Sequence, residues 1–265
     1  MGYQNDELLV HVDGGIAHVT LNRPQARNAL TFEMYEALAA LCARAGTPED
    51  QDDIKVIILS GAGDKAFAAG TDISKFTTFS GIDDGLDYES NVESVISQIE
   101  TCKVPVIAAL HGAVTGGGLV IATAAHIRIA SATVIAGMPI ARTLGNCLAV
   151  SNLRRLVALF GEARVAHMIL TAELMQADSL LASGFVHEIL ADQDALMARA
   201  AQIASRMMTM APLTISATLD GLRRLRHAAP MPNDRDLIGK IYESDDFAEG
   251  VSAFLEKRKP AWRGH

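Results

Sequence analysis

Hydrophobic positions near the start of the chain fall in short runs that predict β-strands. The runs Leu8–Val12 and Ile16–Leu21 flank Asp13-Gly14-Gly15, a turn sequence typical of a β-hairpin. The apolar positions of the next segment, Thr31–Arg44, instead recur at helical spacing. Thr31 stands where its side chain can cap the first turn. The pattern therefore predicts a hairpin followed by a helix.

Three further apolar runs predict buried strands, namely Ile54–Leu59, Val106–Leu110 and Ile127–Ala130. Strands that are buried on both faces are typical of parallel sheets, in which helices form the crossover connections. The alternation of buried strands with helical segments therefore predicts an α/β core.

After about Ser151 the pattern is helical almost throughout. The predicted helices are Ala163–Leu170, Asp178–Ala182, Ala195–Met208, Leu213–Arg226 and Asp246–Lys257. We therefore expect a sheet-containing core over residues 1–195 and a helical lobe over residues 196–265. No low-complexity linker separates the two parts, and no repeat of fixed period is evident.

Composition and charge exclude several classes of protein. Of the 265 residues 49% are hydrophobic and 20% are charged, which supplies a buried core and excludes disorder. A net charge of −8 argues against nucleic-acid binding. The most apolar stretch, Val104–Ala125, is interrupted by glycines and argues against a membrane span. Three scattered cysteines without a zinc pattern, and a polar start at positions 1–7, favour the cytoplasm.

Two loops that each follow a strand carry the chemistry. They span Lys65–Ile73 and His111–Leu119, and both are rich in small residues that allow a ligand to approach the backbone. The glycines of the second loop open a helix, whose free N–H groups and dipole favour negative charge. If the N–H groups of Thr71 and Gly117 converge, they form an oxyanion hole for a thioester carbonyl. Each such donor typically contributes about 3 kcal/mol to transition-state stabilisation.

The two loops and their spacing closely resemble the signature of the crotonase (enoyl-CoA hydratase/isomerase) superfamily. The segments Leu21–Pro24, Asn28–Leu30 and Phe254–Pro260 extend the resemblance over nearly the whole chain. It implies a spiral of β-β-α units with a C-terminal helical trimerisation lobe, in a homotrimer or a dimer of trimers. It also implies coenzyme A as part of the substrate, bound in a hooked shape, and no permanently bound cofactor or metal.

The resemblance assigns roles to residues of the two loops. Thr71 and Gly117 match the family's two oxyanion N–H donors. The wall along pantetheine and adenine is implied for Ala69, Asp72, Ile73 and Ser74, where Asp72 chiefly orients its loop.

The resemblance also implies a nucleotide end of the site. Ala26 and Arg27 match the loop near the phosphates. Phe254 and Lys257 match C-terminal residues that reach adenine or phosphate, sometimes from a neighbouring subunit. Helix-face packing for Phe254 and a solvated charge for Lys257 are the alternatives.

The chain departs from the family at the positions that carry carboxylates. Hydratases of the family use two glutamates, and the first position is Val120 here. The second follows Pro139 and falls on Ile140 or Ala141, and a third position, used by some isomerases and dehalogenases, falls on Ala149. These residues border the expected acyl pocket, but none of them can transfer a proton.

Several polar residues are candidates to replace the carboxylates, each with a plainer alternative. Arg142 suits a carboxylate on the acyl group or an enolate, or else a surface acid. Cys147 is a nucleophile or small core filler. His111 and His126 are most simply satisfied core or loop histidines. The acidic stretch Asp83–Glu93, expected over the acyl pocket, supplies a base or is a solvated face.

The leading hypothesis is an acyl-CoA enzyme that stabilises a thioester enolate and catalyses isomerisation, decarboxylation or thioester hydrolysis more readily than hydration. The main alternative is a catalytically silent acyl-CoA-binding protein of the same fold, and a trimeric scaffold is the third. No P-loop, nucleophile elbow or dinucleotide fingerprint is present.

Overall fold

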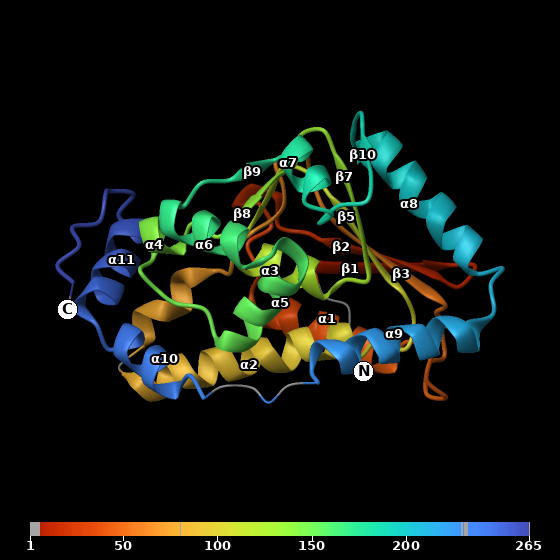
Figure 1. Cartoon of the computed structure of the whole chain (residues 1–265). Helices are drawn as coiled ribbons and strands as arrows, with labels where there is room; N and C mark the ends of the chain where they lie inside the picture. Colours follow the sequence, from red (N-terminus) through yellow and green to blue (C-terminus); the bar gives the residue numbers. More distant parts are fainter. Residues whose placement is uncertain (1–5, 80, 229, 231–232, 265) are drawn as a thin grey trace.

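The computed structural model describes residues 6–79, 81–228, 230 and 233–264, so most of the polar N-terminal stretch lies outside it. Its strands form two sheets (Figure 1). The six-stranded sheet has the order β1 (Leu8–Asp13), β2 (Ile16–Leu21), β3 (Val56–Gly61), β5 (Val106–Leu110), β7 (Ile127–Ser131), β10 (Ile189–Leu190). The four-stranded sheet has the order β4 (Ala66–Ala69), β6 (Ala113–Thr115), β8 (Ile135–Gly137), β9 (Met175–Gln176).

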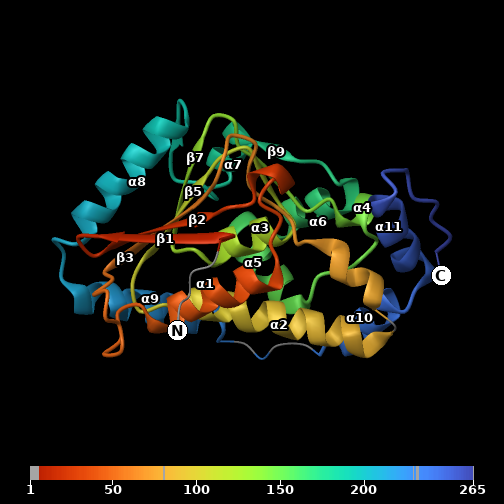
Figure 2. The same ribbon diagram turned by 180° about the vertical axis from the view of Figure 1, so that it is seen from behind.

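The helices lie around these sheets (Figures 1 and 2). The α-helices are α1 (Phe32–Arg44), α2 (Ile82–Glu100), α3 (Gly117–Ala124), α4 (Ile140–Thr143), α5 (Val150–Phe160), α6 (Glu162–Thr171), α7 (Ala177–Ala182), α8 (Gln193–Met207), α9 (Pro212–Arg226), α10 (Arg235–Tyr242) and α11 (Asp245–Leu255). Two 3₁₀ helices are η1 (Pro24–Ala26) and η2 (Ile73–Thr78).

The chain repeats a β-β-α unit. In β3-β4-α2, β5-β6-α3 and β7-β8-α4, the first strand joins the large sheet and the second joins the small one. The neighbours β2, β3, β5 and β7 pair in parallel, and so do β4, β6 and β8. The predicted α/β core with crossover connections is confirmed. The repetition also brings the loops after β4 and β6 to one edge of the small sheet.

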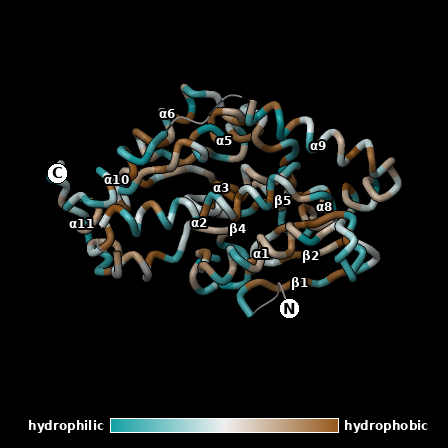
Figure 3. The backbone as a smooth tube through the Cα atoms, turned by 90° about the horizontal axis from the view of Figure 1, so that it is seen from below, coloured by the Kyte–Doolittle hydropathy of each residue, from teal (hydrophilic) through white to brown (hydrophobic). Residues whose placement is uncertain are grey.

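Alternation along the buried strands supplies two hydrophobic cores. In β3, Ile57 and Leu59 belong to the main core together with residues of α1, α2 and α3. Val56 and Ile58 point to the other face, where they pack against α8. In Figure 3, β5 is hydrophobic throughout, whereas hydrophobic and hydrophilic residues alternate along α9.

The acidic stretch Asp83–Glu93 lies in α2, a helix of 19 residues that the hydrophobic pattern did not reveal. Asp83 and Asp87 are exposed, as expected of a solvated face. Glu89 is only 5% exposed, because it falls on the face of α2 that packs into the main core. The interpretation of the stretch as a uniformly solvated face is therefore wrong at Glu89.

The division of the chain after residue 195 stays a prediction, and the structure puts that position inside α8. Since α8 covers one face of the large sheet, it is packed as part of the core. The last helices, α10 and α11, return to contact α2 and η2. In contrast, α9 has no buried residue. Among the described residues, no helix is both long and apolar enough to cross a membrane.

Candidate active site

A cavity of about 850 Å³ lies where the loops after β4 and β6 meet α2, α4 and α11. Most of the residues singled out from the sequence line it: Ala26, Arg27, Ala69, Thr71, Asp72, Ile73, Ser74, Gly117, Val120, Pro139, Ile140, Phe254 and Lys257. Arg142 is exposed on α4 and is not among the lining residues. The structure therefore gathers the predicted positions in one place, with Arg142 outside.

The loop after β4 is fixed by the segment between β2 and α1. The buried Asn28 side chain donates hydrogen bonds to the carbonyls of Ala62 and Ala66, at 2.9 and 2.7 Å. Its oxygen accepts from the backbone N–H of Arg23 at 2.9 Å. The Arg23 guanidinium in turn forms a 2.9 Å ion pair with Asp72. These bonds explain why the asparagine and arginine accompany the loop in the sequence.

Asp72 has a structural set of partners. Besides the ion pair with Arg23, its carboxylate accepts a 3.1 Å hydrogen bond from the backbone N–H of Ser74, which caps η2. Partial burial acts to raise the pKa of Asp72, but the bonds from Ser74 and the charge of Arg23 outweigh it and lower the pKa. Asp72 is therefore ionised, and its carboxylate is bound to Arg23 and Ser74.

The backbone of Thr71 is oriented by a parallel bridge to Leu30. The Leu30 N–H donates to the Gly70 carbonyl at 2.9 Å, and the Asp72 N–H donates to the Leu30 carbonyl at 2.8 Å. In this pattern the flanking residues make the bonds, so the N–H of Thr71 points away from the bridge. No hydrogen bond from that N–H to another backbone group occurs in the described part of the chain.

The N–H of Gly117 is unpaired for a different reason. Gly117 is the first residue of α3, and the first intrahelical donor is Val120, which bonds to the Gly116 carbonyl at 3.1 Å. Close packing requires glycine here: a β-carbon on Gly117 would lie 2.2 Å from the Tyr35 hydroxyl and 2.8 Å from Oγ1 of Thr71. Thr71 and Gly117, one from each loop, therefore lie next to each other.

Two tyrosines that sequence reasoning missed support this arrangement. Oγ1 of Thr71 lies 3.0 Å from the hydroxyl of Tyr35, on α1, and 3.2 Å from that of Tyr88, on α2. Burial raises the pKa of both phenols, so they remain neutral. The available signal was a tyrosine beside Met34 on the apolar face of α1.

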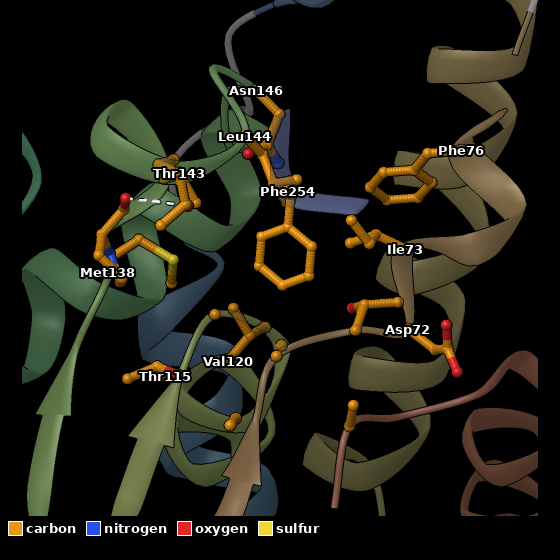
Figure 4. A pocket seen from close by; sticks show the side chains of 18 of the residues that line it. Asp72, Ile73, Phe76, Thr115, Val120, Met138, Thr143, Leu144, Asn146 and Phe254 are labelled. Atoms are coloured by element: carbon orange, nitrogen blue, oxygen red, sulfur yellow. Dashed lines mark hydrogen bonds between the residues drawn. The ribbon is translucent and has the colours of Figure 1, made fainter. Parts of the chain in front are cut away.

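Apolar side chains line part of the cavity. Figure 4 shows the Phe254 ring projecting from α11 into the space between Ile73 and Phe76 on one side and Thr143 on the other. Val120 lies at the start of α3 on the floor of the same view. The half-exposed Phe254 ring is thus a lining group as well as a helix-face residue.

Glu89 adds a carboxyl group to the lining of the cavity. Its Oε1 accepts from the hydroxyl of Tyr242 at 2.9 Å, and its Oε2 accepts from the backbone N–H of Ala149 at 3.3 Å. Burial raises the pKa of Glu89, the two hydrogen bonds lower it, and the nearby acids Asp234 and Glu93 raise it, which leaves it at about 7. The group therefore exchanges its proton near neutral pH.

The other candidate groups are held in unreactive states. Burial, followed by the charge of Glu89, raises the pKa of the Cys147 thiol to about 12, which disfavours a nucleophilic thiolate. Nδ1 of His126 accepts from the backbone N–H of Val106 at 2.9 Å, and burial lowers the pKa of the ring to about 4. Burial also lowers the pKa of His111. No cluster of metal-ligating side chains occurs among the described residues.

Comparisons with known proteins identify the family of the chain. Residues 11–265 match the family model for enoyl-CoA hydratase/isomerase. The chain is 31% identical to a probable enoyl-CoA hydratase of Bacillus subtilis, over 96% of this chain and 97% of that one. It is 30% identical to a peroxisomal Delta(3,5)-Delta(2,4)-dienoyl-CoA isomerase of Arabidopsis thaliana, over 94% and 93%.

A solved structure shows the same fold over the full length. A methylmalonyl-CoA decarboxylase complexed with 2S-carboxypropyl-CoA superposes with a TM-score of 0.87 at 29% identity, covering 100% of both chains. The spiral α/β fold and the resemblance seen in the sequence are thereby confirmed. The chain belongs to the enoyl-CoA hydratase/isomerase family, within the crotonase superfamily.

Proposed function

We propose that this protein is an acyl-CoA enzyme that holds the thioester oxygen between the N–H groups of Thr71 and Gly117. The observation that carries the proposal is that both residues line one cavity and that neither N–H has a backbone acceptor in the described chain. The dipole of α3 adds favourable potential at Gly117. Fixed donors of this kind stabilise the negative charge that develops on the oxygen of a thioester enolate.

The proposed reaction is one that proceeds through an enolate, such as isomerisation or decarboxylation, or else thioester hydrolysis. The relatives include hydratases, a dienoyl-CoA isomerase and methylmalonyl-CoA decarboxylases. Val120, Ile140 and Ala149 border the cavity or its loop and offer no carboxylate to orient and activate water. Efficient hydration of crotonyl-CoA is therefore not expected.

The placement of the substrate follows from the lining. Arg27 and Lys257 both line the cavity and provide positive charge for the phosphates of coenzyme A. Ile73, Phe76 and Val120 line the apolar part, where the acyl group fits. We assign no resident cofactor, since coenzyme A enters and leaves with the acyl group.

The test is a panel of thioesters, including crotonyl-CoA, a 3-enoyl-CoA and methylmalonyl-CoA, with products identified by mass spectrometry. Gly117→Pro and Gly117→Ala form a matched pair, because both add a β-carbon and only proline removes the N–H. Proline is also tolerated at the first position of a helix. We expect the proline variant to turn over at least about 100-fold more slowly than the alanine variant. Equal rates would contradict the oxyanion role.

A catalytically silent acyl-CoA-binding protein is the second candidate, favoured by the apolar residues at positions 120, 140 and 149. Coenzyme A binding in calorimetry without any product from the panel would establish it. Absence of coenzyme A binding would instead favour a scaffold.

A homotrimer or a dimer of trimers belongs to the same proposal. Its support in this chain is α9, which buries no residue and exposes Leu213, Leu222 and Leu225. Sedimentation at several concentrations measures the assembly directly. The cytoplasmic location expected from the cysteines remains a prediction.

A further inference from the structure

The proposed chemistry leaves one function unassigned, the transfer of a proton to or from the substrate carbon. The acidic side chains that line the cavity, within the described chain, are those of Asp72 and Glu89. Asp72 is ionised, and its carboxylate already forms an ion pair with Arg23 and accepts a hydrogen bond from the N–H of Ser74. Glu89 is 5% exposed, and its hydrogen-bond partners among the described residues are neutral groups, the Tyr242 hydroxyl and the Ala149 N–H.

We propose that Glu89, delivered from α2, is the catalytic acid/base of this enzyme and that its substrates are thioesters with a removable α-proton. This inference rests on the proposed function, because the enolate that it creates needs the oxyanion hole. The two hydrogen bonds fix both carboxylate oxygens, and a carboxylate retains further acceptor sites beyond two bonds. Those remaining sites are available to the proton of a substrate carbon.

The Glu89 carboxyl group is held in place by two other segments of the chain. The loop that contains Ala149 carries no acid, but the backbone N–H of Ala149 donates a hydrogen bond to the Glu89 carboxyl group. Tyr242, at the end of α10, holds the other oxygen. The carboxyl thus lies between α2, α10 and the loop before α5.

The groups around Glu89 suit an acid/base that works near neutral pH. Tyr35, Tyr88 and Tyr242 are buried neutral neighbours, and the partly buried thiol of Cys147 is also neutral. The nearby acids are each engaged. An oxygen of Asp234 accepts from the backbone N–H of Val150 at 2.6 Å. Glu93, one turn further along α2, is bound to Arg155 at 2.6 and 2.7 Å.

The step is balanced without any co-reactant. The α C–H bond breaks, its proton passes to the Glu89 carboxylate, and its electron pair moves into the thioester to form the enolate. The proton then returns to the same carbon, which exchanges the hydrogen, or to C4 of a 3-enoyl chain, which completes a double-bond shift. General acid/base catalysis of this kind contributes about 10²- to 10⁴-fold in rate.

The experiment compares the wild type with Glu89→Gln and Asp87→Asn. Both variants remove one carboxylate from α2, but Asp87 is exposed and lies outside the cavity lining. The readouts are exchange of the α-hydrogen of butyryl-CoA in D₂O, isomerisation of a 3-enoyl-CoA, and decarboxylation of methylmalonyl-CoA. Loss of carbon dioxide generates the enolate without proton abstraction, so it separates the oxyanion hole from the base.

We expect Glu89→Gln to lose at least about 100-fold in exchange and isomerisation. Decarboxylation should fall much less, and Asp87→Asn should match the wild type in all three readouts. Wild-type exchange that persists in Glu89→Gln overturns the role of Glu89. No exchange and no product in the wild type overturns the proposed function itself.

A second measurement covers the case in which Glu89→Gln fails to fold. The rate of exchange should rise with pH through a single ionisation near 7 in the wild type, since the carboxylate is the base. Removal of the Tyr242 hydroxyl should shift that ionisation to higher pH. An exchange rate that does not change between pH 6 and pH 8 in either protein overturns the inference.

Discussion

The hydroxyl of Tyr242 donates a 2.9 Å hydrogen bond to Oε1 of Glu89, although 153 positions separate the two residues in the sequence. Tyr242 ends α10 and packs against the rings of Tyr88, Phe79 and Phe247. Burial raises the pKa of this carboxyl group on α2, and the hydroxyl at the end of α10 lowers it. The consequences of this contact are measurable.

Tyr242→Phe should shift the pH dependence of the reaction. The bond from Tyr242 stabilises the charged carboxylate, so its loss raises the pKa of Glu89 above about 7. A hydrogen bond to a charged group is worth roughly 1.5–3 kcal/mol, which corresponds to an upward shift of about one to two pH units. The measurement is kcat/KM against pH. Tyr35→Phe is the control, since that hydroxyl binds Thr71 and not Glu89; coincident profiles for wild type and Tyr242→Phe would refute the contact's role.

Glu89 should also make the stability of the fold depend on pH. Its pKa is about 7 in the folded protein against a reference value of 4.5, so unfolding releases its proton between these values. The folded state binds more protons in that window, and this contribution to stability is therefore present below about pH 4.5 and is lost as pH rises through about 7. Glu89→Gln has no such dependence.

The free energy of unfolding of Glu89→Gln should therefore increase relative to that of the wild type as the pH rises from 4.5 to 8. The increase should be at most about 3 kcal/mol. Urea unfolding of both proteins across this range gives the difference, in which the contributions of other titrating groups cancel. A constant difference across the range would show that Glu89 keeps an ordinary pKa.

Gly117→Ala should destabilise the protein, and its severest collision is with the Tyr35 hydroxyl, which a second substitution removes. The added β-carbon would lie 2.2 Å from the hydroxyl of Tyr35, and overpacking of this kind costs typically 1–3 kcal/mol. Tyr35→Phe removes that oxygen, so the double variant should recover part of the loss. Thermal unfolding of the two single variants and the double variant measures the coupling.

Gly221→Ala is the matched control for this cycle. Gly221 lies in α9 with no atom within 4 Å of an added β-carbon, so alanine there should be neutral or stabilising by up to about 1 kcal/mol. Strict additivity between Gly117→Ala and Tyr35→Phe would contradict the collision.

Arg27→Ala combined with Lys257→Ala should weaken the binding of coenzyme A thioesters specifically. Both residues line the cavity and carry the charge assigned to the phosphates. We expect KM for the acyl-CoA to rise roughly tenfold at low ionic strength, with kcat nearly unchanged, because the loss affects substrate and transition state equally. An acyl-pantetheine thioester, which lacks the nucleotide, should show no such increase. Lys259→Ala, outside the lining, is the control; an equal increase for the truncated substrate would rule out phosphate binding.

The amino-acid sequence was sufficient for the elements whose signals are local. β2 and β5 have the predicted bounds, and Thr31 caps α1 by accepting from the N–H of Met34 at 3.2 Å. These features follow from hydrophobic spacing and cap chemistry within a few residues. The strands β4, β6 and β8 were not predicted, because runs of only three or four residues are too short to show a strand pattern before the neighbouring strands pair with them.

The sequence by itself also determined the family and the two loops with Thr71 and Gly117, because those motifs are contiguous. The tertiary structure decided that Glu89 lines the cavity. Glu89 stands in an acidic stretch like a solvated residue, yet its place on the inner face of α2 buries it against Tyr242 and Ala149. The proton affinity of a carboxyl group depends on the solvent, dipoles and charges around it in space. Those neighbours come from segments far apart in the chain, so only the folded protein defines them.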